Sequence, residues 1–296
     1  MSRTGYHVLS PSPWPISVAC SLMGLCSSLL IFFGEGPIWI FWGVFSCSFF
    51  LIVYSVVNWW GDLILESTYL GEWSSYVVRT YIYGFRLFLL SEIFFFGGLL
   101  ASFIYYGVGE ASIQGVGFWP PRGIKPLHPG KVALLNTGIL VGSGITVNWA
   151  KTCVELHSQI HPKEKSLVVK WPFFNKEVSK SSFDYQLEGL FYLGITIVLG
   201  AWFSFLQYQE YKWSSFTFAD GVAGSIFYFL TGFHGTHVIA GLIFLTVCWF
   251  RLYYCHFSYN NFWTGMWAAA VYWHLVDGVW IFVYGMVYLW GYAGYH

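Results

Sequence analysis

Seven long runs of apolar residues, separated by shorter polar segments, dominate the pattern along this chain of 296 residues. A helix needs roughly 20 residues to cross about 30 Å of hydrocarbon, and most of the runs reach or exceed that length. The runs cover residues 16–33, 37–60, 76–106, 131–150, 187–207, 224–250 and 263–291. The pattern therefore predicts an all-α, polytopic membrane protein with seven transmembrane helices.

The composition supports this prediction and narrows the function. Apolar residues make up 56% of the chain and charged residues 9%, which leaves too little polar surface for a water-soluble protein. The formal net charge is zero, so nothing indicates binding to nucleic acid. The six cysteines show no C-x-x-C spacing, and we expect neither disulfides nor cysteine metal sites.

Lysine and arginine are unevenly divided between the two sides of the predicted helices. The N-terminal side holds nine, and the other side holds four. The nine are Arg3, Arg79, Lys151, Lys163, Lys165, Lys170, Lys176, Lys180 and Arg251, and the four are Arg122, Lys125, Lys131 and Lys212. Because basic residues accumulate on the negative side of a membrane, the N-terminus is predicted on a matrix-like side and His296 on the opposite side.

The chain is predicted to divide into two parts. Residues 1–75 hold the N-terminal segment and the first two helices, and residues 76–296 hold the remaining five helices. The second part contains the longest polar stretch, 151–186, whose lysines, serines and prolines exclude a further span. We expect this loop to lie in water or against a partner. Small residues in the fourth run, including Gly138 and Gly142, favour close contacts between helices.

Glu92 is the clearest acidic residue inside an apolar run, and a carboxylate in hydrocarbon is costly unless it is paired, protonated or hydrated. One hypothesis is a role in proton handling. The other is a protonated acid that forms a hydrogen bond within the helix bundle.

Two pairs of polar residues in the last two runs share helix faces, His234 with His237 and His274 with Asp277. Two histidines with a histidine and an aspartate on a neighbouring helix are plausible metal ligands. The nearby glycines Gly232, Gly235 and Gly241 favour another interpretation, in which the helices cross tightly and the polar residues form hydrogen bonds across the crossing. We favour this structural polar patch of His237, His274 and Asp277, without a metal.

Polar and aromatic residues also follow the second and sixth runs. They include Trp59 and Glu66 after the second run and Arg251 after the sixth. Groups of this kind at the membrane surface suit phospholipid headgroups, although a solvated surface without bound lipid explains them too.

Taken in order, several stretches resemble the cytochrome c oxidase subunit III family over nearly the whole chain. They are His7–Pro15, Trp59–Asp62, Glu66–Thr68, Ser91–Phe95, Trp119–Ile124, Leu134–Thr137, Gly232–Val238 and Tyr272–Asp277. The last two stretches, GFHGTHV and YWHLVD, are the most specific.

The resemblance implies a group of two helices and a group of five, separated by a lipid-filled cleft, in the mitochondrial inner membrane. It implies a non-catalytic core subunit of complex IV in the respiratory chain that carries no haem or copper. Such a subunit stabilises subunit I, contacts other oxidase subunits, binds phospholipids such as cardiolipin, and supports proton uptake by the proton-pumping enzyme during aerobic electron transport. By position, the lipid-binding residues of the family fall on Trp59, Glu66, Arg251, His234 and Phe94, and Glu92 takes the place of the family's buried carboxyl.

Several positions differ from the family pattern, and these differences limit which residue roles can be carried over to this chain. Gly61 and Leu65 stand where the family usually has arginines, so two expected phosphate contacts are missing. Lys151 and Thr152 replace a pair of histidines, and Trp267 replaces a glutamate near the start of helix seven. The loop before helix five is also longer than is usual, and we expect it to contact a lineage-specific partner.

Two other functions fit parts of this pattern. A metal- or haem-binding membrane oxidoreductase would use His234, His237, His274 and Asp277. A transporter would carry protons through Glu92 and Asp277, but no helix has the broken centre typical of transporter sites.

Overall fold

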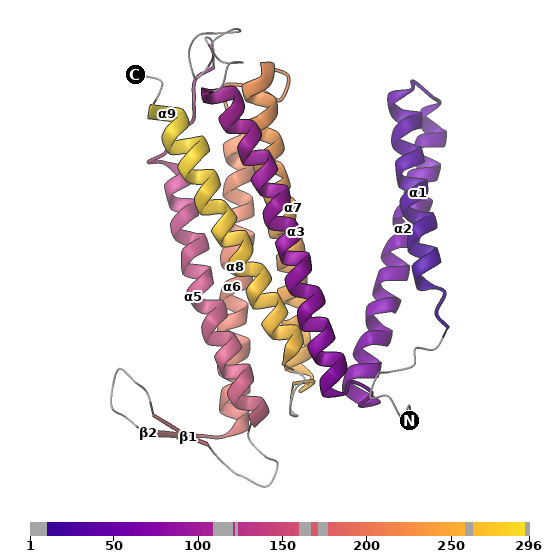
Figure 1. The fold of residues 1–296 in the computed structure, drawn as a ribbon, viewed down its shortest axis with the longest axis vertical. Helices are drawn as coiled ribbons and strands as arrows, with labels where there is room; N and C mark the ends of the chain where they lie inside the picture. The colour runs from indigo at the N-terminus through magenta and orange to yellow at the C-terminus, as the bar shows by residue number, and fades with distance from the viewer. Residues whose placement is uncertain are drawn as a thin grey trace. The chain divides into compact units, whose positions relative to one another are not determined.

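In the computed structural model, the described residues are 11–108, 121, 124–159, 167–170, 177–257 and 263–293. The elements, labelled as in Figure 1, are α1 (Trp14–Phe33), α2 (Ile38–Ile64), η1 (Leu65–Tyr69), α3 (Ser75–Val108), α5 (Val132–Gln159), β1 (Leu167–Lys170), β2 (Glu177–Lys180), α6 (Ser182–Trp213), α7 (Gly221–Tyr253), α8 (Thr264–Val283), η2 (Tyr284–Trp290) and α9 (Gly291–Ala293). The elements η1 and η2 are π-helical turns that continue α2 and α8.

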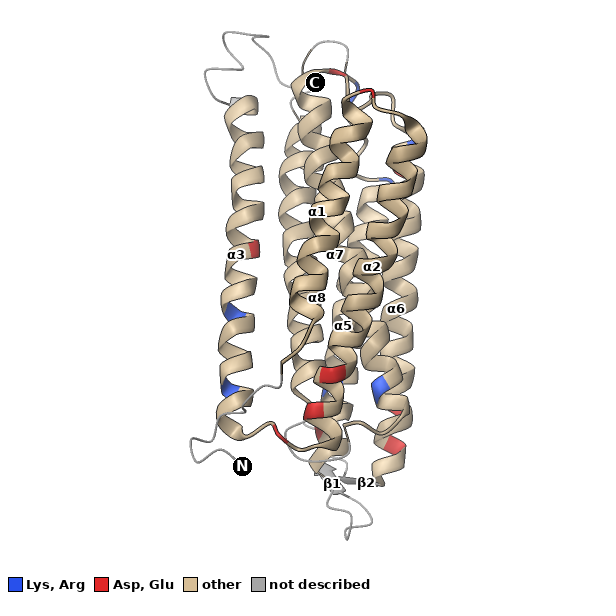
Figure 2. Ribbon diagram, turned by 90° about the vertical axis from the view of Figure 1, so that its right-hand side faces the viewer, with Lys and Arg blue, Asp and Glu red and all other residues tan. Residues whose placement is uncertain are grey.

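Seven of the helices described by the structure are long and apolar enough to cross a membrane, which confirms the predicted number of spans. Figure 2 shows lysine, arginine, aspartate and glutamate mostly near the helix ends, with long central stretches that carry few charges. This distribution fits helices whose centres lie in hydrocarbon and whose ends lie in the headgroup region.

Contacts divide the chain into two compact units, Met1–Thr80 and Tyr81–His296. In the first unit, α1 and α2 pack side by side through small residues. A Cβ atom on Gly24 would overlap the Ser48 hydroxyl, and the hydroxyls of Ser17 and Ser55 form a hydrogen bond. The Trp14 indole N–H also donates to Asp62 Oδ2 at 2.6 Å. Close backbone approach and polar contacts of this kind are what hold helices together in lipid.

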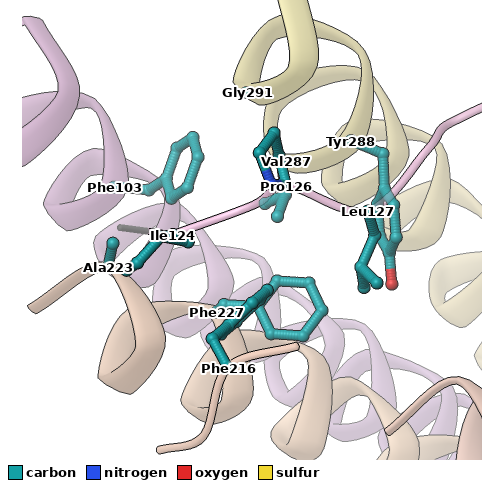
Figure 3. A pocket seen from close by; sticks show the side chains of 10 residues that line it. All are labelled: Phe103, Ile124, Pro126, Leu127, Phe216, Ala223, Phe227, Val287, Tyr288 and Gly291. Atoms are coloured by element: carbon teal, nitrogen blue, oxygen red, sulfur yellow. The ribbon is translucent and has the colours of Figure 1, made fainter. Parts of the chain in front are cut away.

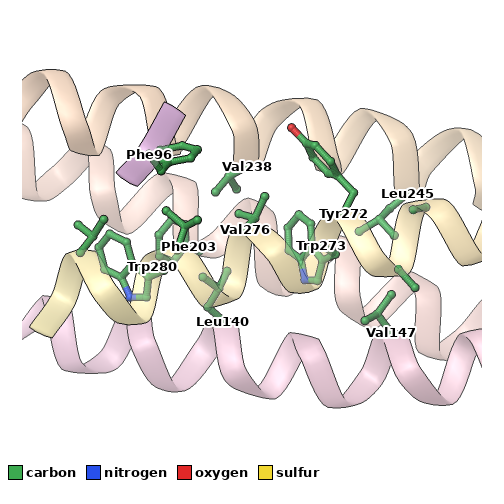
Figure 4. Packing of buried hydrophobic residues seen from close by; sticks show 14 of the residues in the cluster. Phe96, Leu140, Val147, Phe203, Val238, Leu245, Tyr272, Trp273, Val276 and Trp280 are labelled. Carbon is green, nitrogen blue, oxygen red and sulfur yellow. The ribbon is translucent and has the colours of Figure 1, made fainter. Parts of the chain in front are cut away.

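In the second unit, α8 is the central helix, because the most apolar stretch of its span has a larger share of buried residues than that of any other described span. It packs against α5 and α7, and α6 packs against both of those helices. Figure 4 shows the core around Trp273 and Trp280 of α8. The Trp273 indole donates to Ser143 Oγ at 2.9 Å and the Trp280 indole to Thr137 Oγ1 at 3.0 Å, so each buried ring has a polar partner on α5.

Glycines make room for Trp273 on its other side. A Cβ atom on Gly200 of α6 would lie 2.6 Å from the Trp273 ring, and one on Gly241 of α7 would lie 2.9 Å from it. Gly241 thus fits the tight crossing expected from the sequence. Gly232 and Gly235 do not, because a Cβ atom on either would meet nothing within 4 Å.

The segment predicted as a loop at 151–186 is partly helical. Helix α5 continues to Gln159, and α6 already begins at Ser182. Between them, β1 and β2 form an antiparallel pair in which Leu167 lies opposite Lys180 and Lys170 opposite Glu177. The polar residues at both ends therefore extend the helices beyond the hydrocarbon, which hydropathy alone does not detect.

Both ends of this segment are fixed by hydrogen bonds. Ser181 caps α6 and exchanges hydrogen bonds with Asp184, which forms a capping box. His157 Nδ1 lies 2.9 Å from the Ser182 carbonyl oxygen, which joins the end of α5 to the start of α6. Gln186 Nε2 donates to the carbonyls of Leu252 (2.9 Å) and Tyr253 (3.3 Å), so it satisfies the last turn of α7.

Candidate functional site

Glu92 of α3 and His237 of α7 form a pair in the middle of their helices. Glu92 Oε2 lies 2.7 Å from His237 Nε2, and the two side chains are 19% and 18% exposed. The rings of Phe96 and Tyr272 lie beside His237, with centroids at 4.9 Å and 6.5 Å. The pair is thus enclosed largely by aromatic groups.

The other nitrogen of His237 defines how many protons the pair holds. Nδ1 lies 2.7 Å from the Phe233 carbonyl oxygen, which can only accept, so Nδ1 carries a proton. A neutral His237 then accepts at Nε2 from a protonated Glu92. A charged His237 instead donates at Nε2 to a Glu92 carboxylate. Either form gives one hydrogen bond between the two side chains, which compensates for placing these polar groups among apolar helices.

His234 occupies a different environment from His237. It is 1% exposed, its Nε2 donates to the Val276 carbonyl at 3.2 Å, and its ring packs against those of Phe203 and Trp280. Its burial supports a role in helix packing. The assignment of His234 to lipid by resemblance stays a prediction.

The side chains of His274 and Asp277 lie together on α8, against α5. His274 Nε2 donates to Asn148 Oδ1 at 3.0 Å, and its Nδ1 lies 3.9 Å from Asp277 Oδ2. Asp277 is 8% exposed, and neither carboxyl oxygen has a hydrogen-bond partner among the described residues. A Cβ atom on Gly144 would lie 2.7 Å from Asp277 Oδ2, so glycine leaves the space that this carboxyl fills.

The four residues weighed as metal ligands are therefore not brought to one point. His237 contacts Glu92, His234 contacts a carbonyl, and His274 and Asp277 lie on the side of α8 that faces α5. Within the described ranges, no group of three or more histidine, cysteine, aspartate or glutamate side chains is placed to hold a metal ion.

The residues assigned to lipid by resemblance lie in both units. In the first unit, Trp59 is half-buried near the end of α2, and Glu66 is half-buried in the π-helical turn η1. In the second unit, Phe94 of α3 is 71% exposed. Arg251 lies in the last turn of α7, with its guanidinium carbon 4.8 Å from the Phe257 ring centroid.

His256 follows α7 and lies outside the apolar spans. Burial lowers the pKa of His256, and the positive charge of Arg251 lowers it further. His256 is therefore neutral at pH 7, and Arg251 provides the positive charge at this end of α7.

A second polar network joins α5, α6 and η2, and it was not anticipated from the sequence. Asn136 Nδ2 donates to Gln207 Oε1 at 3.2 Å, and Gln207 Nε2 donates to the Tyr288 hydroxyl at 3.3 Å. Tyr288 in turn donates to Glu210 Oε2 at 2.9 Å. The three-residue spacing of Gln207 and Glu210 gave a weak signal of a shared face, but nothing in the sequence indicated Tyr288 as their partner.

Tyr288 also lines the small cavity in Figure 3, together with apolar side chains from α3, α7 and the segments around them. The cavity measures about 40 Å³. A volume of this size is enough for water.

Comparisons with known proteins give matches along nearly the whole chain. The model of the family described as cytochrome c oxidase subunit III matches residues 4–171 and 179–292. Proteins named cytochrome c oxidase subunit 3 from Canis lupus and Equus caballus are each 39% identical to it over 286 residues, covering 97% of both chains. The Oryctolagus cuniculus protein of the same name is 38% identical over 292 residues, again covering 97% of both chains. Matches of this extent, on a chain with seven apolar helices, establish that it belongs to the cytochrome c oxidase subunit III family.

Proposed function

We propose that this chain is a non-catalytic core subunit of cytochrome c oxidase, which stabilises subunit I, holds structural phospholipids and supports proton uptake. The observation that carries the proposal is the family match along almost the whole chain. The haem and copper of the enzyme belong to its partner subunits, and this chain provides packing surface.

The polar contacts inside the second unit support a structural role. His234, Trp273 and Trp280 each donate a hydrogen bond to a neighbouring helix. Contacts of this kind fix how the helices are rotated against one another, which is what a subunit that presents a defined surface requires.

Glu92 and His237 are the residues that we associate with proton uptake. They share a proton in the middle of their helices, and the side chains are only about one fifth exposed. The proton at this contact can reside on Glu92 or on His237 without a change in the net charge of the pair, and this supports the association with proton uptake.

Trp59, Glu66, Arg251 and Phe94 are the residues that we assign to phospholipid. Trp59, Glu66 and Arg251 lie near helix ends, where headgroups are found, and the exposed ring of Phe94 suits an acyl chain. The basic residues counted from the sequence support an orientation with the N-terminal side in the mitochondrial matrix.

Purification of the intact oxidase and of the isolated chain tests this proposal. We expect the chain to purify with subunit I, and the oxidase depleted of it to lose activity faster during turnover. The isolated chain should show no Soret band and no stoichiometric copper. Haem or copper bound stoichiometrically to the isolated chain would overturn the proposal in favour of a redox role.

A further inference from the structure

Arg86 is a charged residue within the membrane-spanning part of α3. It lies 11 residues after the helix begins at Ser75 (86 − 75), or roughly 16 Å along the helix axis. A guanidinium group stays ionised in proteins and is costly to place in hydrocarbon, so its surroundings must compensate for its charge.

Two aromatic rings provide part of this compensation. The guanidinium carbon lies 6.0 Å from the Tyr83 ring centroid and 5.9 Å from that of Trp267. These distances allow a cation–π attraction. Phe85 packs edge-on against Trp267, with centroids 6.0 Å apart, so the indole is supported from a second side.

The contact with Trp267 also sets the depth of the charge. Trp267 lies in the first turn of α8, which begins at Thr264. Nη1 of Arg251 lies at the same turn, 2.9 Å from where a Cβ atom of Gly265 would be. The Arg86 side chain therefore extends back towards the membrane surface where α3 and α8 begin, as long basic side chains do near helix ends.

The rings leave the donors of Arg86 unused. A guanidinium presents five N–H donors, and within the described part of the chain neither a hydrogen bond nor an ion pair engages them. The side chain is exposed on the surface of the second unit. An anion that matches this planar group must therefore come from outside the described residues.

We propose that Arg86, supported by Tyr83 and Trp267, binds the phosphate of a phospholipid in the leaflet at which α3 and α8 begin. The planar fork of arginine pairs with phosphate oxygens through two parallel hydrogen bonds. A tyrosine and a tryptophan beside it are the residues that favour the headgroup level of a membrane. The inference rests on the lipid-holding part of the proposed function and adds Arg86 to the residues assigned to phospholipid.

The test measures phospholipid retained by the intact oxidase after purification in mild detergent, with the wild type compared with Arg86→Gln, Arg86→Lys and Arg79→Gln. Arg79→Gln is the matched control, because it removes the same charge from α3 at a position about two turns nearer the start of the helix. We expect Arg86→Gln to lose one phospholipid per oxidase and Arg79→Gln to keep the wild-type amount. Arg86→Lys should retain less phospholipid than the wild type, because lysine cannot form the two parallel hydrogen bonds.

Two results would overturn this inference and leave the proposed function unaffected. One is an unchanged phospholipid content in Arg86→Gln while the wild type retains lipid. The other is a structure of the whole oxidase in which a carboxylate of another subunit pairs with Arg86. A wild-type oxidase that retains no phospholipid would instead refute the lipid-holding role itself, and this inference with it.

Should Arg86→Gln fail to assemble, the wild-type oxidase gives the answer with a photoactivatable phospholipid. Label recovered on the peptide that contains Tyr83 and Arg86 supports the site. Label recovered only on other peptides refutes it.

Discussion

The contact between Glu92 and His237 shows how a membrane protein can keep a carboxyl group within apolar helices. Because the Phe233 carbonyl fixes the proton on Nδ1 of the imidazole, the state of Glu92 is tied to that of His237. His274 is held differently: its Nε2 donates to Asn148, and its Nδ1 faces Asp277. At 3.9 Å the second pair is too far apart for a direct hydrogen bond, so the two pairs differ in strength.

Replacing Glu92 by glutamine should leave assembly of the oxidase intact. The amide N–H₂ of glutamine can donate to Nε2 of a neutral His237, as a protonated acid does, so we expect the free energy of unfolding to change by less than about 1 kcal/mol. Proton uptake or endurance during turnover should fall mildly, measured as activity over successive turnovers.

Glu92→Leu is the informative contrast, because it leaves His237 Nε2 without its partner and should cost about 1–3 kcal/mol. Ser91→Ala, at an exposed neighbouring position, serves as the control. An oxidase that fails to assemble with glutamine at position 92 would show that the carboxyl has a structural role of its own.

Helix boundaries and helix partners differ in how far they could be predicted from this sequence. The first span was predicted at 16–33 and is found at Trp14–Phe33, because hydropathy changes sharply where this helix leaves the hydrocarbon. Helix α5 runs 9 residues past its predicted end (159 − 150), since polar residues continue it into water. The start of α6 is indicated by the sequence, because Ser181 and Asp184 have the spacing of a capping box.

Partners between helices could not be predicted in the same way. Glu92 and His237 are 145 residues apart, and helices that are apolar on nearly every side give little indication of which face meets which neighbour. The network from Asn136 to Glu210 depends on Tyr288, which lies in a π-helical turn. A π-turn shifts the direction of every following side chain, and no residue type predicts where such a turn occurs.

Gly200 of α6 provides a test of helix packing. Its Cβ in Gly200→Ala would lie 2.6 Å from the Trp273 ring and 2.7 Å from Leu242, both inside the core. We expect overpacking to cost about 1–3 kcal/mol, seen as a lower thermal midpoint of the purified oxidase.

Gly232→Ala on α7 is the matched control for Gly200→Ala, because its Cβ would meet nothing within 4 Å inside this chain. We expect it to be neutral. Equal losses from the two substitutions would mean that the packing around Trp273 does not limit stability.

At the scale of the whole molecule, seven candidate spans among the described residues, an odd number, predict that the two ends of the chain lie on opposite sides of the membrane. The division into Met1–Thr80 and Tyr81–His296 was found from contacts, and each unit is held by its own network of small residues and hydrogen bonds. The predicted lipid-filled cleft between a helix pair and a group of five stays a prediction.

The orientation can be tested with an epitope tag added after His296. From the excess of basic residues on the N-terminal side, we expect an antibody to bind the tag on mitoplasts, whose outer membrane is opened and whose inner membrane is intact. Binding only after the inner membrane is permeabilised would reverse the orientation. A tag on a matrix protein provides the control for leakage.

The hydrogen bonds that Gln186 donates to the end of α7 have a consequence for how this family can diversify. Together with the contact between His157 and Ser182, they anchor both ends of the segment that contains β1 and β2 to the helix bundle. An uncharged amide makes the anchor at α7, so its strength does not vary with acidity. The residues between these two ends can therefore change in number and type during evolution without shifting the register of α5 or α6. New contacts can be acquired there while the transmembrane architecture stays the same.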